Sequence, residues 1–102
     1  MYKEEYENEI DNEKQLIYEG KTYTIQYAHF PNYVRRSEFN GRPIIVGRTW
    51  AYCEVDGVKF EVLADCWVKD AFTPEKGEYV TTGRLLKKMG LPTILADQLG
   101  KY

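Results

Sequence analysis

The stretch that decides the fold runs Arg48-Thr-Trp-Ala-Tyr-Cys-Glu-Val-Asp-Gly-Val-Lys-Phe-Glu-Val-Leu-Ala-Asp-Cys-Trp67. It contains two runs of strand-forming residues joined by Asp56-Gly57. This dipeptide tolerates the positive φ angles of a two-residue type I′ turn. Such a turn makes Val55 face Val58, and the rest of the pairing follows from that pair. The sequence therefore predicts a central antiparallel hairpin.

This register sorts the side chains of the hairpin onto two faces. One face suits a core, because it carries Thr49, Ala51, Cys53, Val55, Val58, Phe60, Val62, Ala64 and Cys66. On the other face Glu54 lies across from Lys59, and Trp50 lies across from Leu63. A large apolar pair of this kind is either covered by another element or left as a contact surface.

Length and composition indicate one domain spanning residues 1–102. A chain of 102 residues with 43% hydrophobic and 29% charged residues is typical of a small soluble domain. It has no apolar run long enough to span a membrane, and its N-terminus lacks the basic and apolar regions of an export signal. We therefore expect a cytoplasmic protein that does not enter a membrane.

The charges are unevenly distributed along the chain. Residues 1–13 contain six acidic side chains and only Lys3, a net charge of −5, whereas the whole chain has a net charge of −2. Tyr2, Tyr6 and Ile10 recur every four residues, so residues 1–13 are predicted to form an acidic helix. Its acidic surface comprises Glu4, Glu5, Glu7, Glu9 and Asp11. This surface is either simply solvated or meets a basic partner, where its carboxylates could mimic nucleic acid.

The remaining segments predict an α+β fold. Residues 14–81 are assigned to the sheet: a second hairpin turns at Glu19-Gly20, residues 44–46 lead into the central hairpin through a kink at Gly47, and residues 78–81 form a fifth strand. The result is a small antiparallel sheet or a five-stranded, partly open barrel built from two hairpins. Residues 82–100 are predicted to form an αα-hairpin, whose spacing also resembles a helix-turn-helix but without basic residues on its second helix.

Residues 29–43 are predicted to form a long loop, the best candidate for a working surface. The loop interleaves aromatic residues with arginines: Phe30, Tyr33 and Phe39 with Arg35, Arg36 and Arg42. Such mixtures suit both the stacking and phosphate pairing of a nucleic-acid site and a protein interface. Alternatively, the aromatic rings pin the loop to the core and the arginines are merely solvated.

The sequence lacks the patterns of common catalytic and metal sites. There is one histidine, and His29, Cys53 and Cys66 do not have the spacing of a zinc site. Phosphate loops, dinucleotide fingerprints and nucleophile elbows are missing from the sequence as well. Cys66 and His29 could form a nucleophile–base pair, but Cys66 is expected on the apolar face as a free thiol, as is Cys53. We therefore expect a non-enzyme without cofactors or metals.

Two functions remain open, and the sequence determines neither the partner nor the oligomeric state. The first is a protein-interaction module, an inhibitor or adaptor of the kind that phages and mobile elements encode. Its contact residues are predicted to be Tyr33, Arg35, Arg36, Phe39, Arg42, Trp50, Tyr52 and Leu63. The second is nucleic-acid binding by the loop arginines together with Arg48, Arg84, Lys87 and Lys88. The acidic N-terminus and the weak basic excess elsewhere favour the first.

Overall fold

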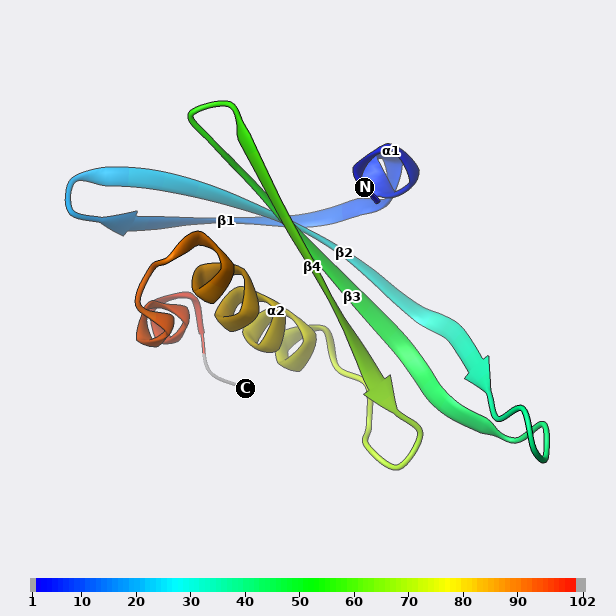
Figure 1. The fold of residues 1–102 in the computed structure, drawn as a ribbon. Coiled ribbons are helices and arrows are strands. Elements are labelled where there is room, and N and C mark those ends of the chain that lie inside the picture. The colour runs from blue at the N-terminus through cyan, green and yellow to red at the C-terminus, as the bar shows by residue number, and fades with distance from the viewer. Residues whose placement is uncertain (1, 101–102) are drawn as a thin grey trace.

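The computed structural model describes residues 2–100, which contain one four-stranded antiparallel sheet in the order β1-β2-β3-β4 (Figure 1). The strands are β1 (Ile10–Tyr18), β2 (Lys21–Arg36), β3 (Pro43–Val55) and β4 (Val58–Trp67). The α+β class and the antiparallel sheet are confirmed. The five-stranded barrel is wrong, because the described sheet has four strands and stays open.

Both hairpins turn where the sequence predicted. Val55 pairs with Val58, and Trp50 pairs with Leu63. Asp56 and Gly57 have φ angles of 50° and 81°, as a type I′ turn requires. Glu19 and Gly20 form the equivalent turn between β1 and β2, with φ angles of 50° and 77°. The register of the central hairpin is therefore confirmed.

One face of the sheet packs against the helix α2 (Pro74–Met89) and the 3-10 segment η2 (Thr93–Leu99). Thr73 begins α2 by accepting a hydrogen bond from the Lys76 amide, and Gly90 ends it in the left-handed conformation. The core on this face consists of two clusters, which contain Ile25, Tyr27, Ala51, Cys53 and Leu85 and, beside them, Leu16, Leu86, Leu95 and Ala96. The face of the hairpin that was predicted to form a core does so, except at Val58 beside the turn, which is 53% exposed.

The opposite face is covered at its centre by the N-terminal segment, α1 (Lys3–Tyr6) and the 3-10 turn η1 (Glu7–Glu9). The Tyr6 ring packs on Phe30 at 4.5 Å between centroids and meets Trp50 edge-on at 5.8 Å. Trp50 is 0% exposed and Tyr52 is 4% exposed. The pair of Trp50 and Leu63 is thus covered by another element, and it does not form an open contact surface.

Four segment predictions need correction. The N-terminal helix is shorter than the predicted residues 1–13, because β1 begins at Ile10. Met1 and residues 101–102, which the predicted domain includes, lie outside the described residues. The long loop 29–43 is mostly strand, since β2 continues to Arg36 across a bulge. The fifth strand at residues 78–81 is wrong, because these residues belong to α2. Consequently α2 starts well before residue 82, and η2 replaces the second helix of the expected αα-hairpin.

Among residues 2–100, no helix has both the length and the apolar character needed to cross a membrane.

Candidate interaction surface

Residues 31–46 project from the body of the sheet as a ribbon, here named the distal arm (Figure 1). The arm begins at a bulge, where the pairing of β2 with β3 shifts between Phe30–Arg48 and Val34–Val46. A bulge bends a strand and increases its twist, which redirects the ribbon away from the body. The molecule is 51 Å long but only 28 and 22 Å in its other dimensions.

The tip of the distal arm is an internally hydrogen-bonded turn. The Ser37 amide donates to the Arg42 carbonyl at 2.8 Å, and the Gly41 amide donates to the Ser37 carbonyl at 3.0 Å. Side chains add to this, since Ser37 Oγ accepts from the Phe39 amide and Asn40 Oδ1 accepts from the Arg42 amide. These bonds hold the tip in a defined shape, and they present Phe39 to solvent with 100% of its side chain exposed.

Three exposed arginines lie within four residues of Phe39 in the sequence. Arg36 donates to the Gly41 carbonyl at 3.1 Å, while Arg35 lies in β2 and Arg42 lies in the turn, just before β3. Within residues 2–100, none of the three has a carboxylate at ion-pairing distance. Their positive charge is therefore available to a partner.

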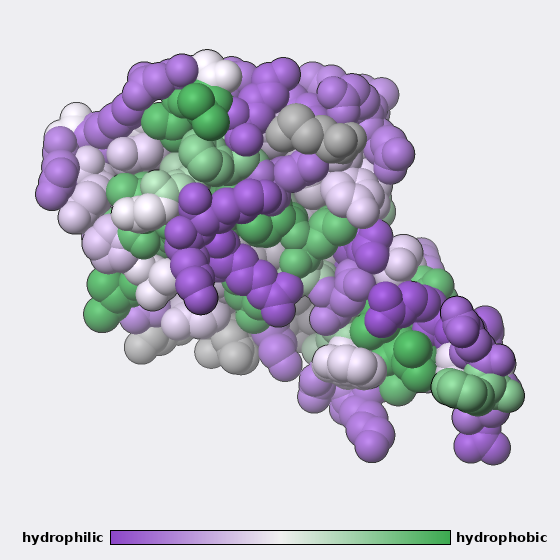
Figure 2. Space-filling model, viewed as in Figure 1, coloured by the Kyte–Doolittle hydropathy of each residue, from purple (hydrophilic) through white to green (hydrophobic). Residues whose placement is uncertain are grey.

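Further apolar side chains are exposed at the same end of the molecule. Trp67, at the end of β4, is 58% exposed, and Val34 and Val68 are also exposed. Arg35, Ile45 and Trp67 form one row across β2, β3 and β4, because Ile45 pairs with both of the others. Figure 2 shows apolar side chains among hydrophilic ones over this projecting end.

Arg48 fixes the base of the distal arm. Its guanidinium lies 3.9 Å from the centre of the Tyr33 ring and donates to both oxygens of Asp65, at 2.7 and 3.1 Å. The hydrogen bonds to Asp65 raise the pKa of Arg48, and Tyr6 contributes another. Tyr33 is half-buried, so it packs against Arg48 at the base of the arm and does not extend into solvent.

The structure thus brings together Arg35, Arg36, Phe39 and Arg42 of the predicted contact residues, and it separates the others from them. Trp50 and Tyr52 are buried, and Leu63 is half-buried beside them. Glu4, Glu5, Glu7, Glu9 and Asp11 are exposed as predicted, although Asp11 is bonded to His29. Arg84 and Lys88 donate to the Leu63 and Glu61 carbonyls of the edge strand β4 and do not extend the distal arm.

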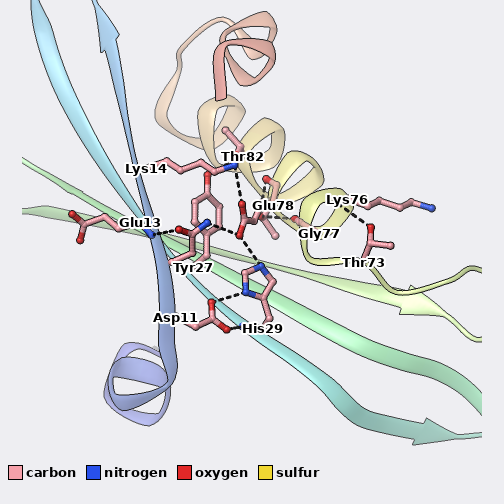
Figure 3. A network of polar contacts seen from close by, with 12 residues as sticks. Asp11, Glu13, Lys14, Tyr27, His29, Thr73, Lys76, Gly77, Glu78 and Thr82 are labelled. Carbon is pink, nitrogen blue, oxygen red and sulfur yellow. Dashed lines mark hydrogen bonds and ion pairs between the residues drawn. The ribbon is translucent and has the colours of Figure 1, made fainter. Parts of the chain in front are cut away.

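A polar cluster between the sheet and α2 was not predicted (Figure 3). Glu78 of α2 is buried, and its carboxylate lies 2.9 Å from Lys14 Nζ and accepts from Asn12 Nδ2 at 2.8 Å. His29 stands between two carboxylates, with Nδ1 2.6 Å from Asp11 and Nε2 3.0 Å from Glu78. The cluster ties β1 and β2 to α2, and nearby the Tyr27 hydroxyl is bonded to that of Thr82.

The chemistry of these residues does not point to a catalytic centre. His29 contacts Asp11 and Glu78, whereas the Cys66 thiol donates to the carbonyls of Trp67 and Asp70. His29 and Cys66 therefore have different partners and do not form the nucleophile–base pair considered above. Burial raises the pKa of the Cys53 thiol to about 11, which disfavours the reactive thiolate. In the described part of the chain, histidine, cysteine and acidic side chains do not form a group of three or more that could hold a metal ion.

One signal for the polar cluster was present in the sequence. His29 alternates with Ile25 and Tyr27, so it belongs to the face that packs against α2. Its partner Glu78 could not be found, because residues 78–81 were assigned to a strand.

No protein-family model matches this sequence, and comparisons with curated proteins and with solved structures gave no significant match.

Proposed function

We propose that this protein is a non-enzymatic interaction module that binds a protein partner through the distal arm. The observation that carries the proposal is the fully exposed Phe39, held on an ordered turn together with three arginines that have no carboxylate partner among residues 2–100. An aromatic ring that is exposed beside arginines is suited to anchor a protein partner, because aromatic residues and arginines dominate the energetics of protein interfaces.

The side chains of the distal arm determine which kind of partner surface would fit it. Phe39 requires an apolar recess, and Trp67 extends the apolar contact along the same end of the molecule. Arg35, Arg36 and Arg42 require carboxylates around that recess, because charge complementarity orients the two proteins and speeds their encounter. A protein that acts only by occupying such a surface is an inhibitor or an adaptor.

Nucleic-acid binding is the second candidate, and the ribbon shape favours it. The major groove of DNA admits a two-stranded ribbon, and an apolar side chain at a tip can wedge between bases. The exposed Val34 and Val68 argue against it, since aliphatic groups have no role on a phosphate backbone. The acidic residues of α1 and η1 also repel phosphate.

Photo-crosslinking tests the proposal. A benzophenone amino acid replaces Phe39 in one sample and Ile17, an exposed apolar residue of β1 outside the arm, in the control. We expect a discrete protein adduct from position 39 in a host lysate and none from position 17. With that partner purified, Phe39→Ala should weaken binding about 30-fold, the effect of losing one hot-spot residue, and Ile17→Ala should not.

Two results would contradict the proposal. One is the same adducts from both positions, or none from either, which would make the distal arm an ordinary surface. The other is salt-sensitive binding of oligonucleotides that Arg35→Ala/Arg36→Ala abolishes, which would establish the second candidate.

A further inference from the structure

The part of β2 that lies in the distal arm is an open edge of the sheet. β1 pairs with β2 only as far as the pair of Ile10 with Ala28, whereas β2 continues to Arg36 (Figure 1). Within residues 2–100, no strand therefore pairs with residues 29–36 on the side of β1. A strand edge of this kind presents backbone N–H and C=O groups on which a further strand can pair.

The end of this edge next to the body is closed. The His29 amide donates to Oδ2 of Asp11 at 3.2 Å, so a side chain takes the place of a strand there. Pro31 has no N–H to donate, and the bulge of β2 begins directly after Phe30. The part that remains open is residues 32–36, which is long enough for a short strand to pair with.

The edge of β4, at the opposite side of the sheet, is occupied by side chains of α2. Arg84 donates to the Leu63 carbonyl at 2.8 Å, and Lys88 donates to the Glu61 carbonyl at 3.0 Å. These bonds occupy carbonyl groups on which a neighbouring strand would otherwise pair. The arm edge is thus more accessible to an added strand than the edge of β4.

The charge at the arm edge determines which strand fits it. Arg35 and Arg36 are consecutive and exposed, so their side chains extend from opposite faces of β2. A strand added at this edge meets positive charge on both of its faces. Opposite charges on paired strands are stabilising, whereas like charges are destabilising. An acidic strand is therefore favoured, and a second copy of the arm, which brings the same arginines, is disfavoured.

We propose that the distal arm binds its partner by strand addition, and that the partner supplies an extended segment rich in Asp and Glu that pairs with residues 32–36 of β2. The backbone groups of the edge provide the hydrogen bonds, and Arg35 and Arg36 select acidic side chains. Phe39 contacts the partner beyond the added strand. This inference rests on the proposed function, because it names the part of the partner that the distal arm recognises.

Amide hydrogen exchange, measured by NMR on the ¹⁵N-labelled whole protein, tests this inference. The probe is a capped octapeptide that alternates glutamate with valine. At a peptide concentration of about ten times its Kd, we expect the rapidly exchanging amides of residues 32–36 to slow about tenfold, because a bound strand protects them. The amides of β1 should keep their exchange rates, since that edge strand carries the carboxylates of Asp11 and Glu13 and repels the probe.

Two matched peptides separate the effect of charge from that of backbone pairing. A peptide with glutamine in place of glutamate lacks the charge and should bind about fivefold more weakly, the effect of losing a few exposed ion pairs. A peptide with N-methylated backbone amides keeps the charge but lacks the donors, and it should give no protection.

Matched variants of the protein locate the site. Arg35→Gln/Arg36→Gln replaces two exposed side chains and should weaken binding of the glutamate peptide about fivefold. Lys87→Gln, which removes an exposed charge of α2, should leave binding unchanged.

The inference is overturned if the glutamate peptide leaves exchange at residues 32–36 unchanged, or if the glutamine peptide protects these residues equally. It is also overturned if the methylated peptide binds as tightly, since the contact would then involve side chains alone. None of these results alters the photo-crosslinking test at position 39. Protection of the edge by the glutamate peptide without a protein adduct at position 39 would support the strand site and contradict the proposed function.

Discussion

At the scale of single residues, Gly77 determines how closely α2 approaches the sheet. A methyl group there would overlap the hydroxyl of Thr49, which is fully buried and without a hydrogen-bond partner in the described structure. We expect Gly77→Ala to lower the free energy of unfolding by about 1–3 kcal/mol, as overpacking does, measured by urea denaturation.

Gly83 supplies the control for this prediction, because it lies in the same helix and a methyl group added there would have nothing within 4 Å. Gly83→Ala should instead raise stability by about 0.5–1 kcal/mol, the difference in helix propensity. Adding Thr49→Ala to Gly77→Ala should restore part of the loss, since it removes the overlapping hydroxyl. Equal effects of the two glycine substitutions would show that α2 is not held at close contact.

The two cysteines differ in environment and should differ in reactivity. Cys53 is fully buried, and burial raises the pKa of its thiol to about 11, whereas Cys66 is half-buried near the surface. We expect iodoacetamide to alkylate Cys66 at least about tenfold faster than Cys53, because only the accessible thiolate reacts. Mass spectrometry of timed samples measures both rates. In denaturant the rates should converge, and a faster Cys53 in the native protein would place that strand at the surface.

At the scale of elements, α1 covers one face of the sheet and owes its stability to the residues that it packs against. The helix has four residues, none of them buried, and lacks a side-chain N-cap. An isolated helix this short does not persist in water. Its attachment depends on Tyr6, which packs on Phe30 and Trp50, and on Glu61, which accepts from both the Tyr2 amide and the Trp50 indole.

Removing the Tyr6 ring should therefore expose Trp50. The experiment uses Trp67→Phe as background, so that Trp50 is the sole tryptophan of the chain. Tyr6→Ala should increase quenching of Trp50 fluorescence by acrylamide and reduce stability by about 1–2 kcal/mol, through loss of aromatic packing. Phe39→Ala, at the far tip of the distal arm, should change neither. If quenching stays the same, Trp50 is shielded by the sheet alone.

The turn residues made the hairpins predictable, whereas the helical segments depend on tertiary contacts that the sequence does not show. Asp56-Gly57 and Glu19-Gly20 favour their turns locally, so the register could be deduced from the chain alone. Thr73 and Pro74 also begin α2 with a favourable cap and first residue, but Gly77 in the same segment argues against a helix. A glycine inside a helix is unfavourable by propensity, and only the close contact with Thr49 explains it.

The candidate site was predictable to the extent that its residues are neighbours in the sequence. Arg35, Arg36, Phe39 and Arg42 belong to one turn and its two flanking strands, so they stay together however the arm is oriented. Trp50 was assigned to the contact surface because its strand register cannot show that α1 covers it. The pairing of His29 with Glu78 joins residues far apart in the chain, and it depends on the position of α2.

At the scale of the whole molecule, the sheet is buried on both faces at its centre, which leaves its projecting end as the exposed part. The apolar clusters occupy the middle of the sheet, with α2 on one face and α1 on the other. Beyond them, Phe39 and Trp67 remain in solvent beside arginines. This difference between a covered centre and an uncovered end is the reason why we propose the distal arm as the partner-binding surface.

Burial of Tyr27 between the sheet and α2 should also make the free energy of unfolding sensitive to alkaline pH. Burial raises the pKa of Tyr27 from an ordinary value near 10 to about 12. The folded protein therefore holds this proton more tightly than the unfolded chain does. The stabilisation is complete below about pH 10 and is lost as the pH rises toward about 12, by at most about 1.4 kcal/mol per pH unit.

Comparison with Tyr27→Phe isolates this effect from the other titrating groups. The variant lacks the ionisable hydroxyl, and it also loses the hydrogen bond to Thr82, which lowers its stability by a constant amount at neutral pH. Urea denaturation from pH 8 to pH 11.5 should show a constant difference up to about pH 9.5, followed by a shift in favour of the variant. If the two curves stay parallel to the highest pH, the hydroxyl ionises as readily in the folded protein as in the unfolded chain. Water would then reach the Tyr27 ring, and the interface between the sheet and α2 would not be closed.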